Sequence, residues 1–145
     1  MKIVVDTNIL LSAAFFPQGI VSEVMLAIAD GHELILSNTV MEEAKMAAAK
    51  KFPAKIDLLE TYFAKLNYRY QEVLPTDVQN LQADIDDPKD KHVLAAAFLA
   101  RAPLIVTGDK HFFSRTYPRI EILTPADFLK KYAPRGRGDF FPRIH

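Results

Sequence analysis

Short apolar segments alternate with helical patterns along almost the whole chain, and this alternation restricts the fold more than any other feature. The runs KIVV, ELIL, PLIVTGD and RIEIL have the length of β-strands. The segment RYQEVL at residues 69–74 is a weaker strand pattern, which we expect at the edge of a sheet. Helical patterns separate these segments, at residues 9–16, 21–29, 38–51, 55–68, 91–100 and 125–132.

Strands that alternate with helices form parallel sheets through right-handed crossovers, with helices on both faces. We therefore predict an α/β fold, a three-layer α/β/α sandwich with a mainly parallel sheet of about five strands. Helical spacing places Phe98, Leu99 and Phe128 in its core. The chain has 145 residues and no internal repeat or low-complexity linker, so we expect one domain over residues 1–132.

Residues 133–145 are predicted to be a basic C-terminal tail. The chain as a whole is neutral, but residues 130–145 hold five basic residues and one acidic residue. Such a segment is expected either to be disordered or to bind a partner, for example a polyanion.

The composition excludes several classes of protein. Half of the residues are hydrophobic and a quarter are charged, which is typical of a soluble globular protein. No apolar run approaches the roughly 18 residues of a membrane span, and the pattern of a secretory signal is absent, so we expect a cytoplasmic location and no membrane contact. The chain has no cysteine, which excludes a disulfide framework and a thiolate metal site. Its five glycines form neither a GxGxxG turn nor a P-loop, so a nucleotide-binding oxidoreductase is not expected.

Two of the predicted strands end in an aspartate, Asp6 in IVVD and Asp109 in IVTGD. In parallel α/β sheets, ligands bind at the carboxyl ends of the strands, where the strand order reverses. If these two strands are neighbours, the two carboxylates lie side by side at that edge. An aspartate after a strand can also cap the next helix, so the position of Asp6 alone does not decide between the two roles.

A glutamate near the start of the helix at 38–51 is a third candidate. With about 100° per residue, Glu43 lies roughly 100° from the centre of the apolar face, and Glu42 roughly 160°. Glu43 is therefore expected at the border of the buried face, where it can reach the edge of the sheet. The alternative is that both acids merely stabilise the first turn of the helix.

Asp90 is the fourth candidate. Asp87 is predicted as an N-cap and Pro88 as the first helical residue, which makes Asp90 the third. At that position Asp90 shares the inward face with three apolar residues, Val93, Leu94 and Ala97. An acid on a buried face is costly unless it is paired or bound to a cation, although Asp90 could also serve in capping.

Four carboxylates that converge at one edge repel one another, so arginine, lysine, shared protons or a divalent metal ion must compensate them. The chain has no cysteine and no His-x-x-x-His pair, and carboxylate oxygens favour Mg²⁺ or Mn²⁺ over Zn²⁺. Such an ion keeps open positions for water and phosphate, which is the arrangement used to hydrolyse phosphodiester bonds.

Four pieces of the sequence, in their order and spacing, resemble the PIN-domain nucleases: VVDTNIL, LSNTVMEEA, DDPKDKHVLAAA and LIVTGDKHFF. The resemblance covers about residues 1–130 and is strongest to small stand-alone prokaryotic PIN proteins, such as the VapC-type toxins of toxin–antitoxin pairs. It implies that Asp6, Glu43, Asp90 and Asp109 are catalytic, and that Asp6, Asp90 and Asp109 bind the metal ion.

The resemblance also implies a reaction and a set of partners. Family members usually cut single-stranded or structured RNA with Mg²⁺ or Mn²⁺, so we expect a metal-dependent endoribonuclease that hydrolyses the RNA backbone with activated water. The expected partners are RNA, a cognate antitoxin protein and a second copy of the chain in a homodimer.

Five further residues match or border the family pattern. Asn8 and Thr107 match small polar positions that help to orient carboxylates or water. Many relatives have another acid two residues after the last aspartate, where this chain has His111, and this leaves the number of metal ions open. His111 is expected either to contact phosphate or to have no role. Lys110 and Arg115 are expected to attract RNA phosphates, or to be ordinary surface charges.

Two alternatives stay open. An inactive PIN fold would only bind RNA or protein, and the histidine at position 111 favours it. A receiver-like module also carries an aspartate at a strand end beside acids and Mg²⁺. Its acidic pair, however, follows the first strand and its acceptor the third, whereas here the acids follow the first strand and a late one.

Overall fold

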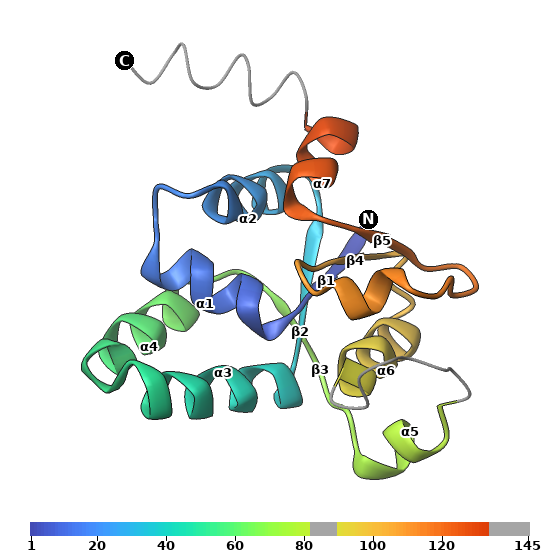
Figure 1. Cartoon of the computed structure of the whole chain (residues 1–145), viewed down its shortest axis with the longest axis horizontal. Helices are drawn as coiled ribbons and strands as arrows, with labels where there is room; N and C mark the ends of the chain where they lie inside the picture. The colour runs from blue at the N-terminus through green and yellow to red at the C-terminus, as the bar shows by residue number, and fades with distance from the viewer. Residues whose placement is uncertain (82–89, 134–145) are drawn as a thin grey trace.

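The computed structural model describes residues 1–81 and 90–133, which form a five-stranded, all-parallel sheet flanked by helices (Figure 1). The strand order is β3-β2-β1-β4-β5. The strands are β1 (Lys2–Val5), β2 (Glu33–Ser37), β3 (Arg69–Gln71), β4 (Leu104–Val106) and β5 (Glu121–Leu123). The predicted α/β sandwich with a parallel five-stranded sheet is confirmed, and the weak strand β3 lies at an edge as expected.

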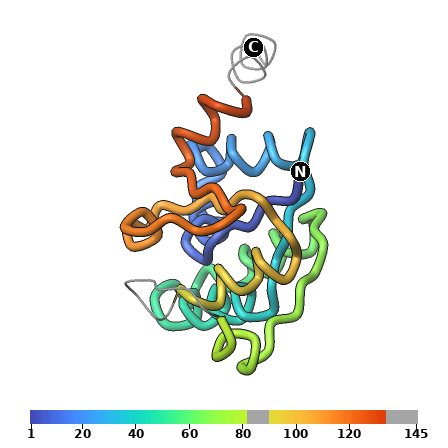
Figure 2. Tube along the Cα trace, turned by 90° about the vertical axis from the view of Figure 1, so that its right-hand side faces the viewer, coloured from blue at the N-terminus to red at the C-terminus, as the bar shows by residue number. Residues whose placement is uncertain are grey.

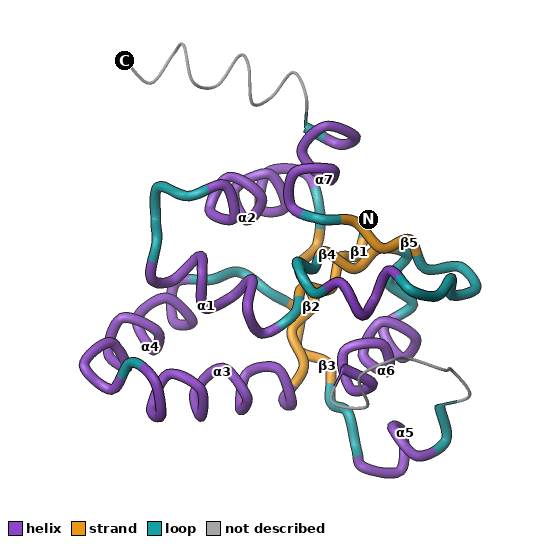
Figure 3. Tube along the Cα trace, in the orientation of Figure 1, coloured by secondary structure: helices purple, strands orange, loops and turns teal. Residues whose placement is uncertain are grey.

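The helices follow the predicted segments closely (Figure 3). They are α1 (Thr7–Phe15), α2 (Ile20–Gly31), α3 (Asn38–Lys51), α4 (Ile56–Lys65), α5 (Pro75–Gln79), α6 (Lys91–Ala100) and α7 (Pro125–Tyr132), with the 3₁₀ turns η1 (Pro53–Lys55) and η3 (Lys110–Phe113). Neither α5 nor η3 was predicted, because one or two turns are too short to show a helical period. No single helix within the described ranges is long and apolar enough to span a membrane, and one sharply bent pair, α1 with α2, meets the length and composition test.

Right-handed crossovers explain the two helical layers. The chain moves from β1 through β2 to β3 in one direction, with α1 to α4 on one side of the strands (Figure 1). It then returns past β1 to β4, which brings α6 to the opposite face, where it packs across four of the strands with α5 against it. The helix α7 packs on α2.

The strand order reverses at β1, because this strand pairs with β2 on one side and with β4 on the other. Val5 is in register with Val106, so the residues that follow β1 and β4 come out side by side at the carboxyl edge. The order also differs from the 2-1-3-4-5 order of flavodoxin-like receivers, which argues against the receiver-like alternative.

The core lies between the sheet and both helical layers. The central strands β1 and β4 are apolar at successive positions because both of their faces are covered. Phe128 is fully buried, as predicted, but the prediction was wrong for Phe98 and Leu99, which are 37% and 44% exposed. The buried face of α6 is centred near Val93 and Ala97, and both of the wrongly placed residues lie more than about 100° from that centre.

Candidate active site

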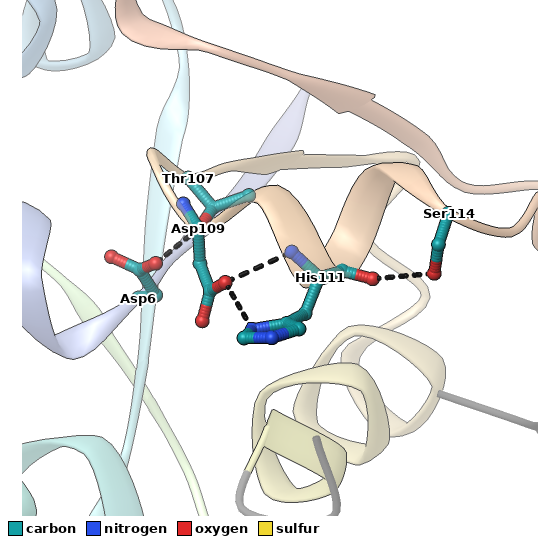
Figure 4. A network of polar contacts seen from close by, with 5 residues as sticks. All are labelled: Asp6, Thr107, Asp109, His111 and Ser114. Atoms are coloured by element: carbon teal, nitrogen blue, oxygen red, sulfur yellow. Dashed lines mark hydrogen bonds and ion pairs between the residues drawn. The ribbon is translucent and has the colours of Figure 1, made fainter. Parts of the chain in front are cut away.

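Asp6, directly after β1, both caps a helix and faces the end of β4. Its Oδ1 accepts a hydrogen bond of 3.0 Å from the backbone N–H of Ile9, in the first turn of α1. Its Oδ2 accepts a hydrogen bond from the hydroxyl of Thr107 (Figure 4). The side chain is buried, with 6% of the residue exposed. The capping role and the site role suggested by the sequence are therefore compatible in one residue.

The turn after β4 holds Asp109 through local hydrogen bonds (Figure 4). The fully buried Thr107 accepts a bond of 2.9 Å at its hydroxyl from the backbone N–H of Asp109. Asp109 in turn accepts at Oδ1 from the backbone N–H of His111 at 2.9 Å, and the same oxygen lies 2.8 Å from His111 Nδ1. The single hydroxyl of Thr107 thus connects the aspartates at the ends of two neighbouring strands.

Asp90 joins this edge from the opposite helical layer. Atoms of Asp90, Asp109 and His111 that can bind a metal ion lie within 4.8 Å of one another. In Figure 2 the segment after β4, in orange, lies beside α6, in yellow. Asp90 is the N-cap of α6 and not its third residue, because the helix begins at Lys91; the predicted roles of Asp87 and Pro88 lie outside the described residues.

Glu43 approaches from α3 and is held by two side chains that the sequence did not indicate. Its Oε1 accepts a hydrogen bond from the hydroxyl of Thr7, the residue after Asp6. Its Oε2 lies 3.5 Å from Nε2 of His92, whose Nδ1 is 2.8 Å from the hydroxyl of Thr39. The side chain of Glu43 is 47% exposed, which agrees with its predicted place at the border of the buried face.

The sequence contains a weak signal for the roles of Thr7 and His92. Each lies within two residues of a predicted acid, and each is a hydrogen-bonding residue at the start of a helix. Sequence spacing does not show that two helices from different crossovers meet there, so the contact with Glu43 was missed.

The surroundings of Asp6 and Asp109 shift the pKa values of these two carboxyl groups in opposite directions. Burial raises the pKa of Asp6, and repulsion from Asp109 and Glu43 adds to this, against the hydrogen bonds from Thr107 and Ile9. Burial also acts to raise the pKa of Asp109. Three hydrogen bonds outweigh the effect of burial and lower the pKa of Asp109: one from the His111 backbone, one with Asp90 and one from the His111 ring. Asp109 and Glu43 therefore affect the ionisation of Asp6, and Asp90 affects that of Asp109.

The carboxylates of Asp6, Glu43 and Asp109 are not paired with lysine or arginine in the described part of the chain. The groups paired with Glu43 and Asp109 are His92 and His111. Burial lowers the pKa of His92, which outweighs the opposite effect of Glu43. Carboxylate oxygens fit a hard divalent cation such as Mg²⁺ or Mn²⁺.

The remaining predicted residues lie around this group. Asn8 is exposed and forms no hydrogen bond with the acids in the described part of the chain, and Thr7 beside it makes the contact instead. Lys110 and Arg115 are exposed, in η3 and just after it. The roles of all three stay predictions.

Substituting Thr107 by valine tests the hydroxyl that connects the two strand ends. Valine has nearly the same shape, but it leaves an oxygen of the buried Asp6 and the N–H of Asp109 without their partner. We expect a loss of about 1–3 kcal/mol in unfolding free energy, measured by urea denaturation. Thr116→Val, at an exposed position, is the control and should change the stability by less than about 0.5 kcal/mol. Equal losses in both variants would contradict the assignment.

The fold and the site together define a class of protein: a parallel α/β domain with acidic side chains from β1, α3, α6 and β4 at the switch in strand order. The family model described as the PIN domain matches residues 2–111, a stretch that contains all four acids. The chain belongs to the PIN domain family, whose members are typically nucleases.

Solved structures of VapBC and VapC proteins share the fold. VapBC2 from Rickettsia felis, bound to a DNA fragment from its promoter, is 16% identical with a TM-score of 0.66, covering 86% of this chain and 98% of that one. DNA-bound VapBC from Salmonella typhimurium is 17% identical with a TM-score of 0.65 and the same coverage. VapC20 from Mycobacterium tuberculosis, a toxin that cleaves the sarcin–ricin loop, is 11% identical with a TM-score of 0.57, covering 81% and 98%. The comparison with curated protein sequences gives no match.

Proposed function

We propose that this protein is a metal-dependent endoribonuclease that hydrolyses RNA phosphodiester bonds with Mg²⁺ or Mn²⁺. The observation that carries the proposal is the meeting of four acids from four separate elements. Asp6 is linked through Thr107 to Asp109, Asp109 interacts with Asp90, and Glu43 is bonded to the residue after Asp6. Helix capping explains Asp6 by itself, but it does not require four carboxylates from separate elements at one edge, where like charges repel one another.

Asp90 and Asp109, which with His111 offer metal-binding atoms within 4.8 Å of one another, would hold the ion, and Asp6, which lies outside that group, would complete the site from the end of β1. When bound, Mg²⁺ or Mn²⁺ would supply an activated water and stabilise the charge that develops on the phosphate. The hydrogen bonds from Thr107 and the first turn of α1 hold the carboxylate of Asp6 in one orientation. Fixed carboxylates of this kind do not have to reorganise during the reaction.

Glu43 and the basic residues would act on the substrate side. The carboxylate of Glu43 is half exposed and is held by Thr7, so it is placed to orient a water molecule and to accept its proton. The exposed Lys110 and Arg115 would attract the phosphates of RNA. Asn8, exposed in the first turn of α1, would contact water or RNA at the same edge.

We assign the protein to the toxins of toxin–antitoxin pairs, with a cognate antitoxin as its partner, a homodimer as its assembly and the cytoplasm as its location. The support for the toxin role and the antitoxin partner is the shared fold with the VapBC structures. The homodimer and the cytoplasmic location follow only from the resemblance to VapC-type proteins. The tail was predicted over residues 133–145, and residues 134–145 lie outside the described residues.

One observation favours the alternative of an inactive PIN fold that only binds RNA or protein. His111 stands where many relatives have an acid, and its Nδ1 lies 2.8 Å from Oδ1 of Asp109. An imidazole that occupies this oxygen competes with a metal ion for it. The nuclease remains the better-supported function because Asp109 has a second oxygen and Asp90 lies beside it.

A cleavage assay tests the proposal. The purified protein is incubated with a fluorescent single-stranded RNA and a structured RNA, in Mn²⁺, in Mg²⁺ and in EDTA. We expect cleavage with either ion, no cleavage in EDTA, and recovery after excess Mn²⁺ is added. Glu42→Gln, at the exposed neighbour of Glu43, is the control and should cleave at the wild-type rate. A gel shift without cleavage in Mn²⁺ would instead support the binding module.

A further inference from the structure

The carboxylate of Glu43 is held at each oxygen by a side chain from a different part of the fold. Thr7 in α1 bonds Oε1, and His92 in α6 faces Oε2 at 3.5 Å. We propose that His92 is a positioning residue for Glu43, and that Thr39 fixes the tautomer in which His92 can donate to it. The proposal rests on the nuclease function above and adds a residue to it.

One consistent direction for the hydrogen bonds around His92 starts from a backbone group. Ser37, the N-cap of α3, accepts at its hydroxyl oxygen from the N–H of Val40 at 3.1 Å. Its own proton is therefore available for the hydroxyl of Thr39, 2.9 Å away. The proton of Thr39 then points to Nδ1 of His92 at 2.8 Å.

This order leaves the proton of the neutral imidazole on Nε2, the nitrogen that faces Glu43. The opposite tautomer would place a lone pair of Nε2 against a carboxylate oxygen, which is repulsive. The separation of 3.5 Å is long for a hydrogen bond, but a small rotation of the half-exposed Glu43 side chain closes it. A second hydrogen bond from His92 would then complement the one from Thr7.

A neutral donor suits this position better than a cation. It restrains the orientation of Glu43 without cancelling the negative charge on which cation binding at the edge depends. Holding a glutamate side chain in one orientation costs rotamer entropy. The side chain of His92 is only 15% exposed where α3 and α6 pack together, so part of this entropy cost is met when the protein folds. His92 thereby joins the helix that carries Glu43 to the helix that begins after Asp90.

The kinetic test uses His92→Phe, which keeps a ring of similar size and removes both nitrogens. We expect kcat for RNA cleavage to fall by about 10- to 100-fold with KM nearly unchanged. His92→Gln, whose amide can donate at a similar reach, should restore most of the rate. In a Glu43→Gln background, His92→Phe should cause no further loss, because the two residues act through the same carboxylate.

Two readouts do not depend on cleavage. ¹⁵N NMR of the metal-free wild type should show His92 protonated at Nε2, and calorimetry should show Mn²⁺ binding to His92→Phe within a few-fold of the wild type. If His92→Phe does not fold, Thr39→Val removes only the hydroxyl that selects the tautomer, and it should also lower kcat.

The outcomes separate this inference from the function on which it rests. A wild type that cleaves no RNA with either ion removes both. A cleaving wild type with an Nδ1–H tautomer, an unimpaired His92→Phe, or additive losses with Glu43→Gln would overturn the positioning role alone.

Discussion

The variants Asp6→Asn and Asp109→Asn are expected to lower RNA cleavage by a factor of about 1,000 or more. Each change keeps the shape of the side chain and removes one negative charge from the edge where the metal ion is proposed to bind. Rates are measured with saturating Mn²⁺ and single-turnover RNA concentrations. Wild-type-like cleavage by Asp6→Asn would contradict the proposed function.

The same two variants should differ in their effect on thermal stability near pH 7. Burial raises the pKa of Asp6, so its ionised form costs free energy in the folded state at any pH above that pKa. Asparagine removes this cost and still caps α1, so Asp6→Asn should raise Tm, at about 2–4 °C for each kcal/mol gained.

Asp109 behaves differently because its folded pKa is lowered. A lowered pKa stabilises the fold at a pH above the unfolded value, and this contribution disappears when the charge is removed. Asp109→Asn should therefore leave Tm unchanged or lower it. From the sequence alone, replacing any of these acids is expected to relieve repulsion and to raise Tm. At Asp109 the hydrogen bonds to the carboxylate remove this gain, so Tm is not expected to rise.

A matched control is available at the other end of the sheet. Asp30 is exposed near the end of α2, before β2 begins, so Asp30→Asn removes one charge far from the carboxyl edge. It should retain the cleavage rate and Tm of the wild type. Equal losses of activity in Asp30→Asn and Asp109→Asn would mean that net charge, not the site, controls cleavage.

Phe112→Ala is expected to cause the largest loss of stability, about 3–5 kcal/mol in unfolding free energy. Phe112 is fully buried in η3, the turn that carries His111 and follows Asp109. Removing the ring leaves a cavity under this turn and releases the backbone that positions the Asp109 carboxylate. Cleavage should therefore fall even at temperatures where the variant is folded.

The adjacent residue supplies the control for this prediction. Phe113 is 43% exposed, so Phe113→Ala removes the same ring from the same turn with little loss of packing. Its unfolding free energy, measured by urea denaturation, should change by less than about 1 kcal/mol. Similar losses in the two variants would show that the turn is not anchored by Phe112.

Much of the fold could be predicted because its determinants are local. Apolar runs of strand length, Pro53 after α3, and the capping Asp6 before α1 depend on neighbours in the sequence. The errors occurred where neighbours do not decide. The sequence of α6 is apolar nearly all round, so the side that is buried depends on how the helix docks on the sheet, and Phe98 and Leu99 were wrongly placed in the core. Asp90 was placed three residues too far into its helix.

The sequence by itself determined that a parallel α/β sheet forms and that aspartates follow two of its strands, because hydrophobic period and capping act over a few residues. Only the tertiary structure decided which side chains meet at that edge. Asp6 bonds Thr107 across 101 positions, Thr7 reaches Glu43 across 36, and Thr39 reaches His92 across 53. Such contacts depend on strand order and helix docking, since β1 is bordered by β2 on one side and by β4 on the other. The physical reason is that a carboxylate's environment is set by distance in space, which the separation along the chain does not measure.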